Sequence, residues 1–532
     1  MRKLPLGIQN FKEIVNGNYV YVDKTNYVYQ LTKDAKYYFL SRPRRFGKSL
    51  LLDTIGAAFS GDKELFKGLF LYDTDYSFKE HPVLRLDMSN IGNKTPEILE
   101  NELSIELKKR AKKEGFDIEY CMPAVIFKTL IEDLYNKYQQ RVVVLIDEYD
   151  KPILDQLNNM KTAEANRQVL RGFYGILKSM DPFLRLTFIT GVSKFTKTSI
   201  FSELNNLLDI TLTKEYANIC GITTLDLSKY FSDHINSMSS LEEFCHHDNL
   251  YDEILTWYDG YSWDGYTRVI NPFSLLSFLI QKRFAGFWYA SGTPKFLVEL
   301  IKEKPSIYTN LKNLEITELM LDLADIEKTT VELMLFQTGY LTIKEVLKTG
   351  KAPIYVLDIP NFEVREAFNL HILSVMTEND NIRTGQAQIQ IGRALKDGNL
   401  QKMLESLRSL FASIPYQLHI DQEAYYHSVF YAVMNVLGFN IDPEVSVSGG
   451  RIDAVLEVDD KVFIMEFKYE KCDASASRET KQKLFDKALD EGMRQIKDKG
   501  YAQKYTDSDK KVYLSAFAFL GRDNIEMRVE YL

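Results

Sequence analysis

The feature that most constrains this 532-residue chain is a short loop between an apolar strand and a helix. The segment reads YYFLSRPRRFGKSLLLDTIGAAF, residues 37–59, and its centre is Gly47, Lys48 and Ser49. Backbone N–H groups at the start of such a helix bind phosphate. The lysine pairs with β- and γ-phosphate oxygens, and the hydroxyl after it binds Mg²⁺. We therefore expect Gly47, Lys48 and Ser49 to form a nucleotide phosphate site, with Ser49 as a metal ligand.

A second, acidic segment supports this interpretation. In RVVVLIDEYDKP, residues 141–152, an apolar run ends in Asp147 and Glu148. In P-loop ATPases an aspartate at this position holds the Mg²⁺ shell, and the next acidic residue polarises the attacking water. A strand that simply runs into an acidic turn is the plain alternative. Because both segments lie in one α/β stretch, we favour an ATP site in which Asp147 binds Mg²⁺ and Glu148 assists hydrolysis.

Two details of this site leave alternatives open. Arg42 stands where the first glycine of the pattern GxxxxGK[ST] belongs. Thr190 ends the apolar run LRLTFIT, residues 184–190, where a polar sensor of the γ-phosphate would sit. Threonine is also a common strand residue. A purely structural role for Thr190 is therefore equally consistent with the pattern.

The periodicity of apolar residues divides the chain into three predicted regions. Residues 1–215 alternate short apolar runs with amphipathic segments, which is typical of a parallel sheet flanked by helices. The clearest strands are expected at Tyr37–Leu40, Val83–Leu86, Val142–Ile146 and Leu186–Thr190. Residues 216–411 are expected to be mainly helical, with one hairpin inside 339–361, and a winged-helix module fits that order. Residues 412–532 return to a mixed α/β pattern.

The C-terminal region places charges inside strands that otherwise suit a protein core. The segment VSVSGGRIDAVLEVDDKVFIMEFKYEK, residues 445–471, reads as two strands joined by a turn. Asp453 lies in the first strand, and Glu466 and Lys468 lie in the second, where alternate residues share one face. Burying such charges is costly unless they are paired or bind a metal.

The types of these three residues suggest a chemistry. Two converging carboxylates suit Mg²⁺ or Mn²⁺, and a neighbouring ammonium can orient water or stabilise charge on a scissile phosphate. A structural Glu–Lys pair is the better explanation of an isolated E-x-K segment. The additional aspartate at this spacing instead favours a nuclease centre, with Asp453 and Glu466 as metal ligands and Lys468 as a catalytic cation.

Glu423 is a further candidate metal ligand. It begins a predicted helix whose apolar stripe contains Tyr426, Phe430, Val433 and Leu437, and it lies on that inward side. A first-turn glutamate that only interacts favourably with the helix dipole is an equal alternative.

Beyond these residues, the sequence is similar to a known bacterial family. The segments that carry the similarity are YVDKT (21–25), RPRRFGKSL (42–50), LIDEYDKP (145–152), FITGVSKF (188–195), FSELNNLLDIT (201–211), WYDGYSW (257–263), NPFS (271–274), SGTPKFL (291–297), FQTGYLTI (336–343) and ALDEGMRQIKDKGY (488–501). They resemble the AAA-ATPase-like proteins joined to a PD-(D/E)XK nuclease domain. The resemblance implies a P-loop NTPase parallel sheet, ATP and Mg²⁺ as cofactors, and a C-terminal α/β nuclease-like domain.

The resemblance also bears on three residues outside the two main patterns. Arg42 belongs to the family's own RPRRFGKS segment, so it does not indicate a damaged loop. Arg45 of the same segment is expected to add phosphate-binding charge, although exposed loop arginines are often only solvated. In the PD-(D/E)XK fold a helix can offer a polar residue to the active site. Gln495 fits that role here, and an exposed helix residue is the alternative.

Composition bears on the compartment and on the partner. Four cysteines are scattered without a CxxC pair, which fits a reducing compartment. We find neither a signal-peptide pattern nor an apolar run of the about 20 residues that span a bilayer. These observations predict a cytoplasmic protein that does not bind a membrane. The net charge of −8 argues against general coating of nucleic acid and restricts contact to a local basic groove.

The sequence therefore predicts an enzyme that binds and hydrolyses ATP and cleaves nucleic-acid phosphodiesters under nucleotide control. Nucleic acid is the expected partner, with DNA favoured over RNA, and homo-oligomerisation stays open. One rival is a STAND-like nucleotide switch or scaffold whose C-terminal domain binds without cutting. A second rival, a DNA translocase or repair ATPase, lacks the expected helicase motifs. The complete set of Asp453, Glu466 and Lys468 favours cleavage over the switch or scaffold.

Overall fold

A computed structural model describes the chain in two compact units, one up to Val364 and one from Arg365 onward. The described residues are 1–194, 200–201, 204, 206–239, 241, 244, 249–288, 314–321, 331–348, 352–376, 381–412, 429–430, 433–434, 441–447, 450–473, 476–500, 502, 510–520 and 524–532. Each unit is described separately below. The regions 1–215, 216–411 and 412–532 remain our proposed division of the chain.

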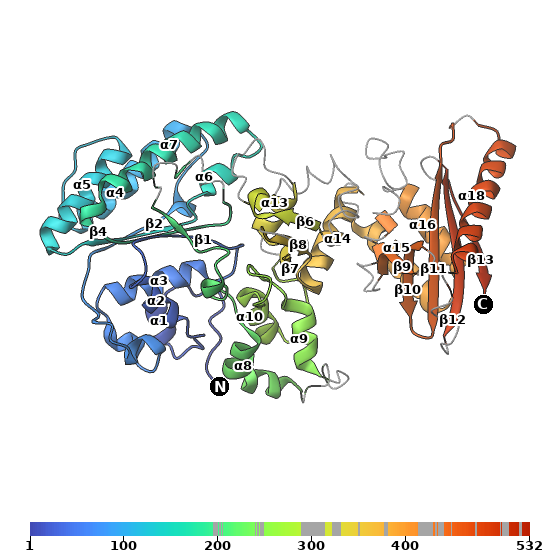
Figure 1. Cartoon of the computed structure of the whole chain (residues 1–532), viewed down its shortest axis with the longest axis horizontal. Coiled ribbons are helices and arrows are strands. Elements are labelled where there is room, and N and C mark those ends of the chain that lie inside the picture. The colour runs from blue at the N-terminus through green and yellow to red at the C-terminus, as the bar shows by residue number, and fades with distance from the viewer. Residues whose placement is uncertain are drawn as a thin grey trace. The chain divides into compact units, whose positions relative to one another are not determined.

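The first unit contains a five-stranded sheet in which all strands run parallel (Figure 1). The spatial order is β2-β3-β4-β1-β5. The strands are β1 (Tyr37–Ser41), β2 (Val83–Asp87), β3 (Val142–Asp147), β4 (Leu184–Gly191) and β5 (Leu208–Asp209). Every residue of β1 and β3 is buried, as expected for strands covered on both faces. The predicted parallel sheet is confirmed, and each of the four predicted strands is present.

Helices cover both faces of this sheet, with α1–α3 on one face and α4–α7 on the other (Figure 1). Their bounds are α1 (Phe11–Asn16), α2 (Thr25–Leu31), α3 (Lys48–Phe59), α4 (Pro96–Lys113), α5 (Pro123–Tyr138), α6 (Lys151–Leu154) and α7 (Met160–Ser179). Short 3-10 turns lie at η1 (Lys63–Phe66), η2 (Phe70–Asp73), η3 (Met88–Asn90), η4 (Asp181–Phe183) and η5 (Lys214–Tyr216). Apolar residues of α4, α5 and α7 pack with strand residues in one core, which holds the carboxyl ends of the strands in place.

The rest of the first unit is mainly helical, as predicted. It contains α8 (Thr224–Ser239), α9 (Leu250–Tyr258), α10 (Pro272–Gln281), α12 (Glu318–Leu321) and α13 (Val331–Thr338). Its strands are β6 (Leu314–Thr317), β7 (Thr342–Leu347) and β8 (Ile354–Asp358), in the order β6-β8-β7. The expected hairpin corresponds to the antiparallel pair β7 and β8. The winged-helix assignment stays a prediction.

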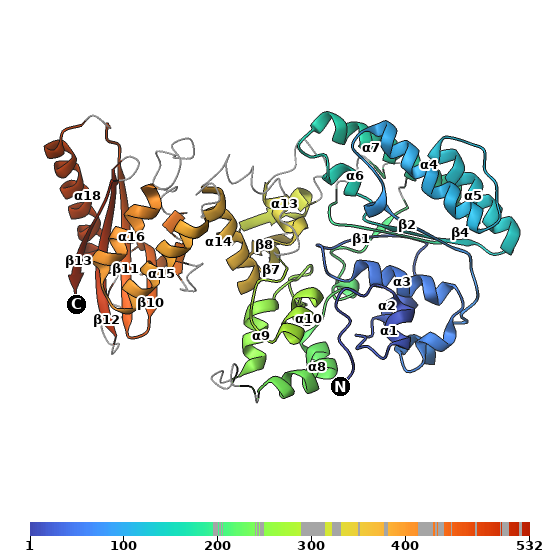
Figure 2. The same cartoon turned by 180° about the vertical axis from the view of Figure 1, so that it is seen from behind.

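The second unit contains a sheet in the order β13-β12-β11-β10-β9. Its elements are α15 (Asn381–Lys396), α16 (Leu400–Ala412), β9 (Ile441–Val447), β10 (Gly450–Val458), β11 (Lys461–Glu470), α18 (Arg478–Asp498), β12 (Lys511–Leu520) and β13 (Asn524–Tyr531), with α14 (Phe362–Met376) leading into it. Strands β11 and β12 are parallel. Helix α18, which lies between them in the sequence, packs against both (Figure 2). The predicted strand–turn–strand segment is therefore the antiparallel pair β10 and β11. No helix in the described part of the chain is long and apolar enough to cross a membrane.

One helix start in the first unit gives a test of the fold. Asn271 is fully buried, and its side-chain oxygen accepts hydrogen bonds from the N–H groups of Phe273 and Ser274 at the start of α10. We expect Asn271→Ala to destabilise the first unit by about 0.5–2 kcal/mol, because two buried N–H groups lose their acceptor. Urea unfolding followed by tryptophan fluorescence would measure this, and Asn271→Ser should lose less because it keeps a capping oxygen. Equal midpoints for Asn271→Ala and wild type would contradict the assignment.

Candidate nucleotide site and nuclease centre

The loop from Arg42 to Gly47 connects the carboxyl end of β1 to the start of α3. Gly47 has a φ of 91°, which favours glycine, and an added Cβ there would have no heavy atom within 4 Å. Open space therefore lies beside Gly47, the residue that precedes the first N–H groups of α3. An α-helix leaves these groups without internal partners, so they are available for an anion.

Lys48, the first residue of α3, is hydrogen-bonded to the backbone of the loop. Its Nζ donates hydrogen bonds of 2.9 Å to the carbonyl oxygens of both Arg42 and Pro43, and the residue is 6% exposed. Burial lowers the pKa of Lys48, while the carboxylates of Asp147 and Glu148 raise it. A buried ammonium that binds only neutral carbonyls would gain from exchanging them for phosphate oxygens. The loop and Lys48 therefore fit a nucleotide triphosphate.

The acidic residues lie where neighbouring parallel strands end. Asp147 closes β3, and its Oδ1 accepts hydrogen bonds from Thr190 Oγ1 of β4 (2.8 Å) and from the N–H of Glu148 (3.1 Å). Burial raises the pKa of Glu148, and the Lys48 ammonium lowers it. The fold thus brings Lys48, Asp147, Glu148 and Thr190 to one edge of the sheet. Thr190 orients the Asp147 carboxylate, and its predicted sensor role stays a prediction.

The contacts of two further predicted residues, Ser49 at the start of α3 and Arg45 in the loop, do not show whether they bind a ligand. Ser49 is half-buried, and its carbonyl accepts a hydrogen bond from Arg85, so its predicted role as a Mg²⁺ ligand is not tested by these contacts. Arg45 is exposed and its guanidinium lies 4.7 Å from the centre of the Phe273 ring. Its predicted contribution to phosphate binding likewise stays a prediction.

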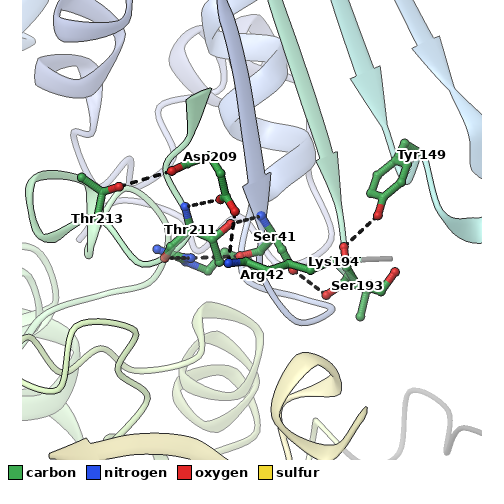
Figure 3. Close-up of polar contacts among 9 residues, drawn as sticks. Ser41, Arg42, Tyr149, Ser193, Lys194, Asp209, Thr211 and Thr213 are labelled. Atoms are coloured by element: carbon green, nitrogen blue, oxygen red, sulfur yellow. Dashed lines mark hydrogen bonds and ion pairs between the residues drawn. The ribbon is translucent and has the colours of Figure 1, made fainter. Parts of the chain in front are cut away.

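Arg42 explains why the first glycine of the usual loop pattern can be absent. Its fully buried guanidinium donates to the carbonyls of Ser41 and Thr211 at 2.9 and 2.8 Å (Figure 3) and contacts those of Tyr216 and Ala217. It also lies 4.0 Å from the ring centre of Trp263. Burial lowers the pKa of Arg42 to about 10. The side chain thus points away from the phosphate region and anchors the loop to residues far along the chain.

Aromatic packing strengthens this anchor. Phe46 of the loop is 1% exposed, and its ring meets those of Tyr261 and Trp263 edge to face at 4.8 and 5.3 Å. Gly339 approaches the same loop, since an added Cβ there would lie 2.8 Å from Pro43. The segments WYDGYSW (257–263) and FQTGYLTI (336–343) carry the family resemblance without an evident catalytic residue. The structure shows that residues of both pack against the loop.

Asp150 is a residue that the sequence analysis missed. It is 1% exposed, and its carboxylate accepts hydrogen bonds from Val192 N–H, Ser193 N–H and Ser193 Oγ. Burial raises the pKa of Asp150, and the Ser193 hydrogen bonds lower it. Asp150 thus fixes the backbone that directly follows Thr190. Its position two residues after Glu148 was the available signal, but the groups that donate to it follow another strand, β4.

Three of the predicted C-terminal residues come together on neighbouring strands. Ala454 pairs with Met465, and this antiparallel register places Asp453 opposite Glu466. Lys468 Nζ lies 2.9 Å from Glu466 Oε1, and Asp453 Oδ2 accepts a hydrogen bond from the N–H of Phe467. Glu466 is fully buried. Burial raises its pKa to about 7, the Asp453 carboxylate raises it as well, and Lys468 lowers it.

The second oxygen of Glu466 indicates what is missing from this cluster. Among the described residues, Glu466 Oε2 has no hydrogen-bond partner although it is buried. A buried carboxylate oxygen without a partner is costly, and a divalent cation would satisfy it. Asp453 and Glu466 supply two hard oxygen ligands, and Mg²⁺ commonly completes its shell with water. The site therefore fits Mg²⁺ or Mn²⁺.

The other two predicted C-terminal residues are Gln495 and Glu423. Gln495 is half-buried on α18, three residues after Gly492 and four before Lys499, so all three share one side of the helix. An added Cβ on Gly492 would lie 3.7 Å from Lys468, and the charge of Lys499 lowers the pKa of Glu466. That side therefore approaches the cluster, and the predicted role of Gln495 stays a prediction. Glu423 lies outside the described residues.

The buried arginine allows a direct test. We expect Arg42→Gly, although it restores the usual loop glycine, to destabilise the protein by at least about 2 kcal/mol. The change leaves a cavity and several buried carbonyls without a donor. Chemical unfolding would measure the loss, with Arg44→Gly as the matched control because Arg44 is the exposed neighbour in the same loop. Equal stability of the two variants would show that the Arg42 contacts contribute little.

Comparisons with known proteins match the two regions of the chain that contain these residues. A family model described as a predicted AAA-ATPase matches residues 5–201, which contain the Lys48 loop and Asp147. A model of the PD-(D/E)XK nuclease superfamily matches residues 421–528, which contain Asp453, Glu466 and Lys468. An uncharacterized protein in the vnfD 5' region of Azotobacter chroococcum mcd 1 is 36% identical over 98% of this chain and 97% of its own length. The chain thus belongs to the family that joins a predicted AAA-ATPase domain to a C-terminal PD-(D/E)XK nuclease superfamily domain.

Proposed function

We propose that this protein binds and hydrolyses ATP and uses its C-terminal domain to cleave nucleic-acid phosphodiesters under nucleotide control. The observation that carries the proposal is the cluster of Asp453, Lys468 and fully buried Glu466, with one oxygen of Glu466 left without a partner among the described residues. A chain that only bound nucleic acid would gain nothing from so costly an arrangement.

At the nucleotide site, the residues have separable tasks. The N–H groups that begin α3 bind phosphate, and Lys48 leaves the Arg42 and Pro43 carbonyls to pair with phosphate oxygens. Ser49 and Asp147 would hold Mg²⁺, which neutralises charge on the phosphates. Glu148, next to Asp147, accepts a proton from the attacking water. Its raised pKa supports this task, because a carboxylate of higher pKa is the stronger base.

At the nuclease centre, Asp453 and Glu466 would hold the divalent cation, which supplies a water of lowered pKa at a phosphodiester. Lys468 is hydrogen-bonded to Glu466 and partly exposed, so it can reach toward charge that develops on the phosphate. Gln495 and Lys499, on the side of α18 that approaches the cluster, would orient water or the backbone of the substrate. Nucleic acid is the proposed substrate, with DNA ahead of RNA.

We propose that nucleotide control acts through the residues against which the loop from Arg42 to Gly47 packs. Lys48 binds the carbonyl of Arg42, and the Arg42 side chain contacts Trp263 and the backbone near Thr211. Any shift of Lys48 toward phosphate therefore acts on a loop that is packed against the helical region. We propose that this region transmits the change, and that the protein acts in the cytoplasm.

The nuclease centre is tested by cleavage of supercoiled plasmid, single-stranded DNA and RNA with Mg²⁺ or Mn²⁺. We expect Glu466→Gln to lower the cleavage rate by about 100-fold or more, since it removes a metal ligand. Glu470→Gln is the matched control, because Glu470 lies on the same strand and pairs with Lys487 at the surface. EDTA should stop cleavage by the wild type. If no substrate is cut while ATP turnover is normal, the switch or scaffold becomes the better description.

The nucleotide site is tested separately by calorimetric titration with ATP and Mg²⁺. We expect Lys48→Ala to weaken ATP binding by about 10-fold or more and to abolish the effect of ATP on cleavage, because the buried ammonium is removed. Lys67→Ala, at an exposed lysine of the same domain, should behave as wild type. Cleavage that responds to ATP in the Lys48→Ala variant would contradict nucleotide control at this site.

A further inference from the structure

A buried ion pair joins the two strands that flank β1 in the parallel sheet. Lys194 follows the end of β4, Asp209 ends β5, and β1 lies between these strands (Figure 3). Lys194 Nζ lies 3.1 Å from Asp209 Oδ2, and each side chain is only 8% exposed. The pair therefore lies at the carboxyl edge of the sheet, where the loop from Arg42 to Gly47 begins.

Asp209 also holds the backbone that follows β5. Its Oδ1 accepts a hydrogen bond of 2.9 Å from the N–H of Thr211. Burial opposes the ionisation of Asp209, but the Lys194 charge and the Thr211 hydrogen bonds outweigh it and hold the pKa of Asp209 below its ordinary value. Asp209 is therefore a buried anion that binds Lys194 with one oxygen and Thr211 with the other.

Thr211 connects this ion pair to the start of the loop. The residue is 2% exposed, and its Oγ1 accepts a hydrogen bond of 3.0 Å from the N–H of Ser41, the last residue of β1. Its carbonyl oxygen accepts a second one, of 2.8 Å, from the Arg42 guanidinium. On the β4 side, the Gly191 carbonyl accepts from the N–H of Arg42, and the Val192 carbonyl accepts from the Ser41 hydroxyl. Ser41 and Arg42 are thus held from both flanking strands.

The same backbone carries an acceptor of Lys48. The Arg42 carbonyl oxygen accepts a hydrogen bond of 2.9 Å from Lys48 Nζ. A continuous series of contacts therefore runs from Asp209 through Thr211 and Arg42 to the ammonium that is proposed to bind phosphate. A displacement of Thr211 would move the backbone to which Lys48 is hydrogen-bonded.

We propose that Lys194 and Asp209 are positioning residues of the nucleotide site. Through Thr211, the ion pair holds the base of the loop in the conformation that binds the phosphates. This inference rests on the proposed ATP site and adds to it the residues that orient the loop. A buried ion pair contributes little net stability compared with apolar residues of similar size, which favours a role in fixing geometry. Neither residue needs to touch the nucleotide.

Titration of the full chain with ATP and Mg²⁺, at a temperature where each variant is folded, separates positioning from stability alone. Thr211→Val keeps the branched shape but removes the acceptor of the Ser41 N–H. We expect it to weaken ATP binding by about 10-fold or more, because small displacements of binding groups have large effects. Thr211→Ser keeps the hydroxyl and should bind ATP like wild type. Asp209→Asn, which breaks the ion pair, should weaken ATP binding by a similar factor.

The matched control is an ion pair at the opposite end of the same strands. Lys36 and Asp181 precede β1 and β4, and their charged groups lie 2.9 Å apart. Asp181→Asn should leave ATP binding unchanged, although it also removes an ion pair from the first unit. Wild-type ATP affinity in folded Thr211→Val or Asp209→Asn would overturn the proposal, as would equal weakening by Asp181→Asn. If wild type bound no ATP, the proposed ATP site itself would fail.

A second measurement needs no variant and covers the case in which the variants do not fold. Coupling between two parts of a protein is reciprocal, so ATP should stabilise the Thr211 contacts that stabilise its own site. Hydrogen–deuterium exchange of wild type, followed by mass spectrometry, would measure this in peptides that cover residues 209–213. We expect saturating ATP to slow exchange there several-fold and to leave exchange in α4 unchanged. Equal exchange of residues 209–213 in the free and the ATP-bound protein would overturn the proposal.

Discussion

Two cations, Arg42 of the loop after β1 and Lys48 at the start of α3, are buried at the carboxyl edge of the parallel sheet, and both are held by carbonyl oxygens. Arg42 contacts the carbonyls of Ser41, Thr211, Tyr216 and Ala217, and Lys48 binds those of Arg42 and Pro43. Placing a charge in the interior is expensive unless hydrogen bonds compensate it. The conformation of the loop from Arg42 to Gly47 and its packing against the helical region depend on this compensation.

The same physical constraint shapes the C-terminal domain. Glu466 is buried within a largely apolar strand, and Lys468 hydrogen-bonds one of its oxygens while the other has no partner among the residues that the structure describes. Asp453 lies opposite it in the register and raises its pKa. Both sites of the protein therefore hold charges in positions that a ligand would relieve. Such positions reduce stability and are typical of binding and catalytic centres.

Much of the fold could be read from the sequence because its signals are local. The continuous apolar runs predicted strands buried on both faces, and all four were found in one parallel sheet. The two-residue spacing of Glu466 and Lys468 predicted a shared face, and their side chains meet. The task of Arg42 could not be predicted, since two of its acceptors, Thr211 and Tyr216, lie about 170 residues further along the chain. The same holds for Asp150, whose hydrogen-bond donors, the Val192 N–H and the Ser193 N–H and hydroxyl, follow β4.

The sequence by itself determined which candidate groups are present: a strand–loop–helix segment with Lys48, an acidic strand end at Asp147, and a carboxylate–ammonium pair at Glu466 and Lys468. These follow from residue type and short-range spacing, which a strand or a helix start converts directly into geometry. Only the tertiary structure decided how the loop is held and what lies beside it. The carbonyls around Arg42 and the Thr211 hydroxyl that binds the Ser41 N–H belong to segments distant in sequence. Packing alone brings those segments together, because hydrogen bonds and apolar contacts between remote residues leave no periodic signal along the chain.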